Sequence, residues 1–480
     1  MAEQAAVAVP AFESEQVQAA LKTRKQRKAS IRPIGELIAE IKQQSERIDD
    51  RLVPFSKLRA VCHETPHQKI TDDGAEDLPS TFDLRLKLGR EDGAIEMPMY
   101  ERVLTQLSGL TNVNDRAGVP SAYLRRLLDS NYDNNFINLA AVNVNEFLTR
   151  RSGEKHQRGK KVEKCVFVRS LKDDDGKPII RALLSDRYFI LNNLDIALTA
   201  LSIVTKNNDG GTAVKDARAF DWHLDPFQFE LGFVNPAVAF DLKNPDKGLI
   251  RCEAKTDDHG WVYPGGGSFD LQKGWTGRLG EGDKSQHLVF PACFISNSET
   301  GGGSASVEMS FMEAVCLNTA RMGQSITRRH LGGLMETADD YTSDETKKKV
   351  REAWLAMMAD SMKQVFDEKK FEENCKAFLG LASIEIKDVK KVTEHLISAI
   401  PGADALLDDV LKAYGQFNTG RNTVLDVQRA ITTVSQEQPH EKAVKLEKIA
   451  GGLITGEVKV PKDMLSAAIV PSIYAERRAA

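Results

Sequence analysis

The residues with the clearest chemical potential in this sequence are cationic. Between Arg150 and Lys164, seven of fifteen residues are Lys or Arg, and only Glu154 and Glu163 oppose them. Two glycines and a single apolar residue, Val162, are typical of an exposed loop. Clustered Lys and Arg bind phosphates without reading base sequence. The segment is therefore either a solvated hairpin or a loop that follows a phosphate backbone.

Other cationic residues lie in or next to expected strands and helices and could contribute to the same phosphate-binding surface. A guanidinium suits phosphate because its planar fork donates two hydrogen bonds, and a helix end adds backbone donors. Some of these arginines are expected to be ordinary surface or ion-pair residues. The candidate nucleic-acid-binding residues are Arg150, Arg151, Arg158, Lys160, Lys161, Arg181, Arg187, Tyr188, Arg321, Arg328, Arg329 and His330.

A second chemistry is suggested by the sequence DWHLD. It places Asp221, His223 and Asp225 on one side of an expected strand, and His259 and His287 could complete a metal site. Such a site would suit a metal-dependent nuclease. Histidine and aspartate two residues apart also arise easily in ordinary strands, and nothing in the sequence ties the distant histidines to them. We therefore predict no metal ligand.

The glycine-rich stretch SETGGGS could carry a nucleophile among Ser296, Ser298 and Glu299, but no base is positioned beside them. The stretch lacks the Lys-Ser/Thr pair and the strand-to-helix context of a phosphate-binding loop. The chain also has no dinucleotide fingerprint, no GxSxG and no HExxH. We predict no catalytic residue and no cofactor, while the question of enzymatic activity stays open.

Two strand–turn–strand–helix patterns would position this chemistry. In the first, the strands CVFVRSL and PIIRALLS flank the turn KDDDGK, and a helix begins at Asn192 or Asn193. In the second, a strand over 288–295 and an alternating strand over 305–311 flank the glycines, and apolar spacing predicts a helix over 311–326. We interpret both as one ββα pattern, without sequence identity between them.

The remaining segments complete an α+β prediction. Helical spacing predicts a helix over 34–48, three helices within 99–148 and a helical region over 343–450. Alternating residues predict strands between 227 and 254. We therefore expect a central antiparallel sheet built from ββα-like units, with a helical N-terminal region and a C-terminal helical domain. The expected divisions are a basic arm and helix at 1–60, an α+β core at 61–340, a helical domain at 341–455 and a tail at 456–480.

The glycine-rich segment 257–286 has two interpretations. Trp261, Tyr263 and Trp275 lie among glycines with Lys273 and Arg278, and aromatic rings beside cations can stack on bases. The same residues could instead form a lid over the core.

Composition limits the class of protein. The 480 residues suggest about two to four domains. A net charge of −4 excludes a chain that is basic throughout, so nucleic-acid binding needs local patches. The six cysteines lack zinc-motif spacing and are expected to be reduced, as in a cytoplasmic protein. No run approaches 18 uninterrupted apolar residues, so we expect no membrane span.

Several motifs together resemble a known family. IIRALLSDRYFILNN, SNSETGGGSASVEMSFMEAVCLNT, ITRRHLGG, QLSGLTNVNDRAGVPSAYLRRLL and NTVLDVQRAITTVSQ resemble the phage- and plasmid-encoded family called domain of unknown function 932. The last motif often has an aromatic residue where this chain has Leu425. The resemblance covers roughly residues 100–450. It implies mobile elements, the cytoplasm of a bacterial host and DNA metabolism, and it provides no catalytic residues.

The ββα pattern with a basic loop is also similar to the annealing proteins of phage recombination, which form rings around a cationic groove for single-stranded DNA. The leading hypothesis is accordingly a homo-oligomeric protein that binds or anneals single-stranded DNA in recombination or replication, without cofactor. A metal-dependent nuclease and a phage structural or host-interaction protein are the alternatives.

Overall fold

Helices and antiparallel sheets make up the fold, which confirms the α+β prediction. The structure is a computed structural model. It describes residues 34–71, 74–89, 94–100, 103, 126–128, 134–157, 160–185, 191–205, 217–242, 244–254, 260–262, 268–270, 274–275, 288–300, 305–313, 319–328, 344–417 and 421–466.

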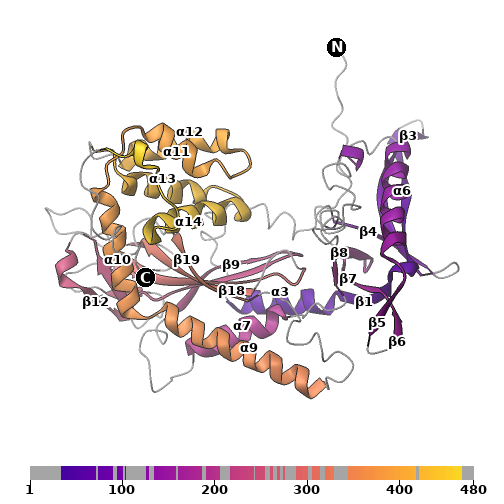
Figure 1. The fold of residues 1–480 in the computed structure, drawn as a ribbon, viewed down its shortest axis with the longest axis horizontal. Helices are drawn as coiled ribbons and strands as arrows, with labels where there is room; N and C mark the ends of the chain where they lie inside the picture. The colour runs from indigo at the N-terminus through magenta and orange to yellow at the C-terminus, as the bar shows by residue number, and fades with distance from the viewer. Residues whose placement is uncertain are drawn as a thin grey trace, which may run out of the picture.

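A large antiparallel sheet organises the second half of the chain (Figure 1). Its central strand is β17 (Leu288–Asn297). This strand pairs with β18 along one edge and with β10 and β11 in succession along the other. The outer strands are β9 and β12 beside β10 and β11, and β19 beside β18. The strands are β9 (Arg218–Leu224), β10 (Phe229–Val234), β11 (Val238–Asp241), β12 (Leu249–Arg251), β17 (Leu288–Asn297), β18 (Ala305–Glu313) and β19 (Thr319–Arg328).

Strand β17 is central because nearly every residue in it is apolar and both of its faces are buried. Val289 and Cys293 belong to the main hydrophobic core, whereas Phe290 and Phe294 belong to a smaller cluster on the opposite face. Gly232 lies opposite Phe294 in β10. A Cβ atom there would come within 2.8 Å of the Phe294 ring, so only glycine fits.

The predicted helix over 311–326 is wrong wherever the structure describes it, because 311–313 end strand β18 and Thr319–Arg328 forms strand β19. Its residues alternate as a strand requires. Ala320 and Met322 join the main core, and Arg321 lies with Phe294 on the other face. The helical spacing of the apolar residues matched by coincidence, and pairing with the open edge of β18 overrides it. The second unit is therefore three strands, while the first follows the predicted ββα order.

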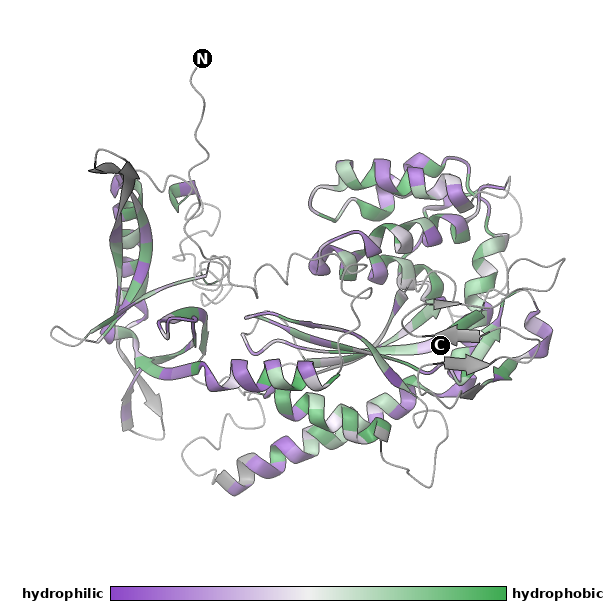
Figure 2. Ribbon diagram, turned by 180° about the vertical axis from the view of Figure 1, so that it is seen from behind, coloured by the Kyte–Doolittle hydropathy of each residue, from purple (hydrophilic) through white to green (hydrophobic). Residues whose placement is uncertain are grey.

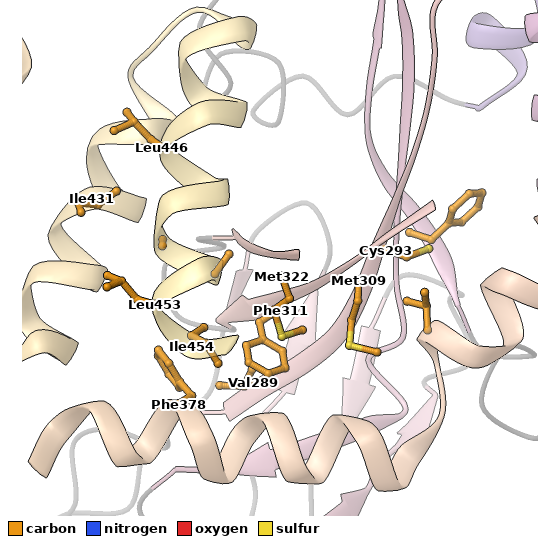
Figure 3. Close-up of a cluster of buried hydrophobic side chains, with 14 of the residues drawn as sticks. Val289, Cys293, Met309, Phe311, Met322, Phe378, Ile431, Leu446, Leu453 and Ile454 are labelled. Carbon is orange, nitrogen blue, oxygen red and sulfur yellow. The ribbon is translucent and has the colours of Figure 1, made fainter. Parts of the chain in front are cut away.

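Helices cover the sheet on both sides (Figure 1). Apolar residues of α3, α7, α9 and α10 join those of the sheet in the main core, and α14 lies along β19. Figure 3 shows Phe311 of β18 near Phe378 of α10, with a ring separation of 6.1 Å. These helices are α3 (Ile34–Glu46), α7 (Asn193–Thr205), α9 (Asp344–Val365), α10 (Glu368–Gly380) and α14 (His440–Thr455).

Three further helices complete the predicted C-terminal helical region. They are α11 (Val389–Ile397), α12 (Ala403–Phe417) and α13 (Val424–Gln436). The Thr423 side chain accepts the backbone N–H of Asp426 at the start of α13, and the Asp426 carboxylate accepts the N–H of Thr423 in return. This reciprocal capping satisfies backbone donors that the first turn leaves unpaired.

Among the described residues, the N-terminal module contains two three-stranded sheets, one long helix and a two-stranded hairpin. The first has the order β1-β7-β8, with β1 (Ile48–Pro54), β7 (Cys165–Lys172) and β8 (Pro178–Ser185). The second has the order β2-β3-β4, with β2 (Leu58–Thr71), β3 (Gly74–Leu88) and β4 (Ile95–Pro98). A bridge from Met99 to Ile180 joins the two sheets.

Helix α6 (Asn134–Arg151) packs against β2 and β3 and shares their hydrophobic core. It confirms the third of the helices predicted within 99–148. The first two lie mostly outside the described residues, of which Val103 and 126–128 are helical. The strands over 58–98 had no predicted counterpart.

Figure 2 shows hydrophilic and hydrophobic residues interleaved along each helix, as expected for helices with one face on a core. No helix in the described ranges has both the length and the apolar character to cross a membrane. The five cysteines within those ranges carry free thiols.

Candidate nucleic-acid interface

The basic segment 150–164, here called the basic ribbon, is the end of a helix followed by a hairpin. Arg150 and Arg151 form the last turn of α6. Gly153 then takes a φ of 121°, which favours glycine, and the chain enters β5 (Glu154–Gln157) and β6 (Lys160–Glu163). The hairpin extends beyond the C-terminal end of α6 (Figure 1).

Strand register separates the acidic residues of the ribbon from its cations. Glu154 and Glu163 face each other at the base, and the Ser56 hydroxyl donates a hydrogen bond to Glu163. Lys161 is exposed farther along β6, opposite His156, and Lys160 pairs with Gln157. Residues 155–162 contain four Lys or Arg and no Asp or Glu. All the charged residues in the distal half of the ribbon, Lys and Arg alone, are therefore cations.

Three cations beside the ribbon base were not predicted. Lys57 lies in the short 3-10 turn Phe55–Lys57, next to Ser56. Arg59 of β2 and Lys87 of β3 are cross-strand partners, and Leu58 and Leu88 pair at the adjacent position. Lys57 and Arg59 are exposed and Lys87 is half-buried; none of the three forms an ion pair with a described carboxylate, although Lys87 lies opposite Glu96 of β4. The alternation of Leu84, Leu86 and Leu88 with charged residues was the signal that could have revealed this strand.

Backbone hydrogen bonds hold these cations against the ribbon. The N–H of Phe55 donates to the carbonyl of Lys164 over 3.0 Å, and the N–H of Gly89 donates to the carbonyl of Lys57 over 3.0 Å. We call Lys57, Arg59, Lys87 and the basic ribbon together the cationic surface.

The two arginines at the end of α6 remain near the surface. Arg150 is 56% exposed and pairs with Glu146 over 2.9 Å within the same helix. Such an exposed pair contributes about 0.2–1 kcal/mol and gives way readily to a phosphate. Arg151 is half-buried, and its guanidinium carbon lies 5.7 Å from the centre of the Phe147 ring.

The structure overturns the prediction that Arg181 contacts phosphate. Arg181 in β8 is buried and donates to the Glu299 carboxylate over 3.0 Å and to the carbonyl of Pro226 over 3.1 Å. Burial and the neighbouring charge of Arg169 lower the pKa of Arg181, and Glu299 opposes them. Arg181 therefore stabilises the interior of the protein and is not accessible to a phosphate.

Glu299, considered above as part of a nucleophilic site, is the centre of this buried junction. Its carboxylate accepts the N–H of Asn193 over 2.9 Å and lies 3.7 Å from Arg169, which also pairs with Asp50 over 2.9 Å. The junction therefore joins β1, β7, β8 and α7 to the turn after β17. A carboxylate enclosed by these partners has a structural role.

The prediction for Arg321 is also wrong. This side chain is 1% exposed, and its guanidinium binds Glu230 through two hydrogen bonds of 2.5 and 2.6 Å. Glu447 of α14 accepts a third bond over 2.9 Å. Burial alone would lower the pKa of Arg321, but Glu230 and Glu447 raise it above its usual value. Arg321 thus attaches α14 to the sheet.

The DWHLD residues form a second buried polar contact with α14. His223 lies 2.9 Å from the Asp225 carboxylate and stacks on His440 with ring centres 3.9 Å apart. Burial tends to raise the pKa of Asp225, but hydrogen bonds from His223 and two backbone N–H groups lower it overall. Among the described residues no group of three His, Cys, Asp or Glu side chains could hold a metal ion.

For three other predicted residues the structure gives only the position in a strand. Arg328 ends β19 opposite Ala305. Trp261 and Trp275 lie on short strands within the segment interpreted as a loop or lid, at positions that both pair with Phe269. Predicted residues outside the described ranges are Arg158, Arg187, Tyr188, His259, Tyr263, Lys273, Arg278, His287, Arg329 and His330.

Comparisons with protein-family models, with curated proteins and with solved structures find no match to this chain.

Proposed function

We propose that this protein binds nucleic acid, with single-stranded DNA as the preferred form, through the cationic surface. The observation that carries the proposal is the distal half of the ribbon, where four Lys or Arg occur without any acid. Seven cations against two acids give residues 150–164 a net charge of +5, so the rest of the chain carries −9. A local excess of this size attracts phosphates even in an acidic protein.

The cations beside the ribbon support the proposal. Lys57, Arg59 and Lys87 extend the positive charge from the ribbon base onto the β2–β3 hairpin. Lys57 and Arg59 are exposed and form no ion pair with a described carboxylate, so they can exchange water and counterions for phosphate oxygens at little cost.

The proposal includes the biological setting implied by the family resemblance. We infer a role in the recombination or replication of phage or plasmid DNA in the bacterial cytoplasm. The similarity to ring-forming annealing proteins supports a homo-oligomer. The proposed activity is binding or annealing, with positioned cations and no covalent step. Among the described residues the nuclease alternative finds no supporting geometry, because Asp221, His223 and Asp225 are buried and His223 stacks on His440 of α14.

Binding of labelled single- and double-stranded oligonucleotides should be measured across a salt series, with and without magnesium. We expect binding that weakens as salt rises, with a slope that reports the number of neutralised phosphates. The absence of binding at low salt would overturn the proposal. Magnesium-dependent cleavage would replace it with the nuclease.

A further inference from the structure

A row of apolar residues crosses the β1-β7-β8 sheet on the face opposite the core of the N-terminal module, and this row is exposed at its β1 end and buried at its β8 end. Leu52 pairs with Phe167, and Phe167 pairs with Leu184, so the three side chains share one face. Leu52 is 58% exposed, Phe167 is half-buried and Leu184 is buried, so only the first two can reach a ligand. The three residues belong to none of the hydrophobic clusters among the described residues, whereas Val53 and Val166 on the opposite face belong to the core of the N-terminal module.

This row directly continues the cationic surface. Strand β6 of the ribbon runs through Lys164 into β7, and Cys165 at the start of β7 pairs with Pro54. Leu52 and Phe167 are two residues farther along these strands, or about 7 Å at the usual rise of a strand. In the described sheet β1 is an edge strand, so Leu52 lies at an open margin.

The Phe167 ring has a fixed cationic neighbour. The guanidinium carbon of Arg169 lies 6.0 Å from its centre, and Arg169 is held in turn by Asp50 and Glu299. A ring beside a fixed guanidinium can bind a base by stacking at little cost in side-chain entropy, because the guanidinium restricts its motion before binding.

We propose that Leu52 and Phe167 are the base-contacting part of the site and give it preference for single strands. This inference rests on the proposed function, since the row contains no charge and cannot bind phosphate. A duplex hides the faces of its bases by stacking, whereas a single strand exposes them to an aromatic side chain. A strand whose phosphates lie on the ribbon and Lys57 would bring its bases to the adjacent apolar row.

The test compares substitutions in the row with a matched control. Phe167→Leu keeps an apolar side chain and removes the ring, and Leu52→Ser changes an exposed position that folding does not require. Met357→Ser, on α9 and 42% exposed, is the control. We expect Phe167→Leu to weaken single-strand binding about tenfold and Leu52→Ser to weaken it less. Duplex binding, the salt slope and the urea midpoint should be unchanged.

A fluorescence measurement adds an independent result. In Phe167→Trp, single-stranded DNA should quench fluorescence beyond the change seen in the wild type, whose four tryptophans provide the background. Two results would overturn the inference, provided that the wild type binds single-stranded DNA. In the first, Phe167→Leu and Leu52→Ser both bind single strands as tightly as the wild type. In the second, the two variants lose single-strand and double-strand binding equally. Those results leave the proposed function intact. Failure of the wild type to bind overturns both.

Discussion

The chain contains two groups of cations that look alike in sequence and differ completely in structure. Arg181 and Arg321 are enclosed by carboxylates in the interior. Lys57 and Arg59 lie exposed on the N-terminal module. The first group joins elements of the fold, and the second is available to a ligand. Residue type therefore says little about the role of a cation until the face of its strand is known.

The contrast has a physical basis in solvation. Removing a guanidinium from water costs several kcal/mol, roughly, and the protein recovers this only with close carboxylate partners. Arg321 has two carboxylates within 2.9 Å, and a phosphate would have to displace both. Exposed cations remain hydrated and exchange counterions freely. Substitutions in the buried group should therefore change stability, and substitutions in the exposed group should change binding.

The largest effect is expected for Arg321→Met. The substitution leaves the Glu230 and Glu447 carboxylates buried without the guanidinium that neutralises them, which costs about 3–5 kcal/mol in the free energy of unfolding. Urea unfolding followed by circular dichroism measures the loss. Arg150→Met, which breaks an exposed pair, is the control and should cost less than about 1 kcal/mol. Equal losses for the two variants would show that Arg321 is no more structural than a surface arginine.

Glu299→Gln should have the next largest effect. It removes the negative charge that Arg169 and Arg181 share, and we expect a loss of about 2–3 kcal/mol because two buried cations are left with Asp50 alone. Glu146→Gln provides an exposed carboxylate control. Thermal unfolding of both variants gives the comparison. An unchanged melting temperature for Glu299→Gln would mean that the junction contributes nothing to stability.

A paired charge reversal tests the exposed group. The double variants Lys160→Glu/Lys161→Glu and Lys348→Glu/Lys349→Glu both change the net charge from −4 to −8. Only the first alters the ribbon, while the second alters α9. We expect the ribbon variant to bind single-stranded DNA at least about tenfold more weakly at low salt. Equal weakening by both variants would indicate a general charge effect and would remove the ribbon from the site.

The smallest effect concerns the buried DWHLD residues. The pKa of Asp225 is lowered in the folded protein, so its ionised form stabilises the fold above the usual pKa of about 4. That contribution is lost as pH falls through the lowered pKa. The stability advantage of wild type over Asp225→Asn, about 1 kcal/mol near pH 6, should therefore shrink below pH 4. Unfolding curves from pH 6 to pH 3 measure it, and a constant difference would contradict the assigned ionisation.

Local patterns predicted those elements whose burial follows from their own residues. Strand β17 and helix α13 were predicted because apolar runs, helical periodicity and caps are local signals. Strand β19 was missed because its pairing with β18 depends on the rest of the sheet. The same limit applies to the site. Glu447 lies 126 residues from Arg321, and no local pattern brings them together. The pairing of Arg59 with Lys87 likewise became visible only in the folded sheet.

The most direct test of the central claim is the salt dependence of single-stranded DNA binding by Arg59→Gln/Lys87→Gln. Neither side chain forms an ion pair with a described carboxylate, and the two like charges lie opposite each other, so the substitutions should not lower the urea midpoint. If each cation neutralises one phosphate, the log–log salt slope should fall by roughly 1.4 relative to wild type, at about 0.7 per contact for a single strand. An unchanged slope would contradict the assignment of these two cations to a nucleic-acid interface.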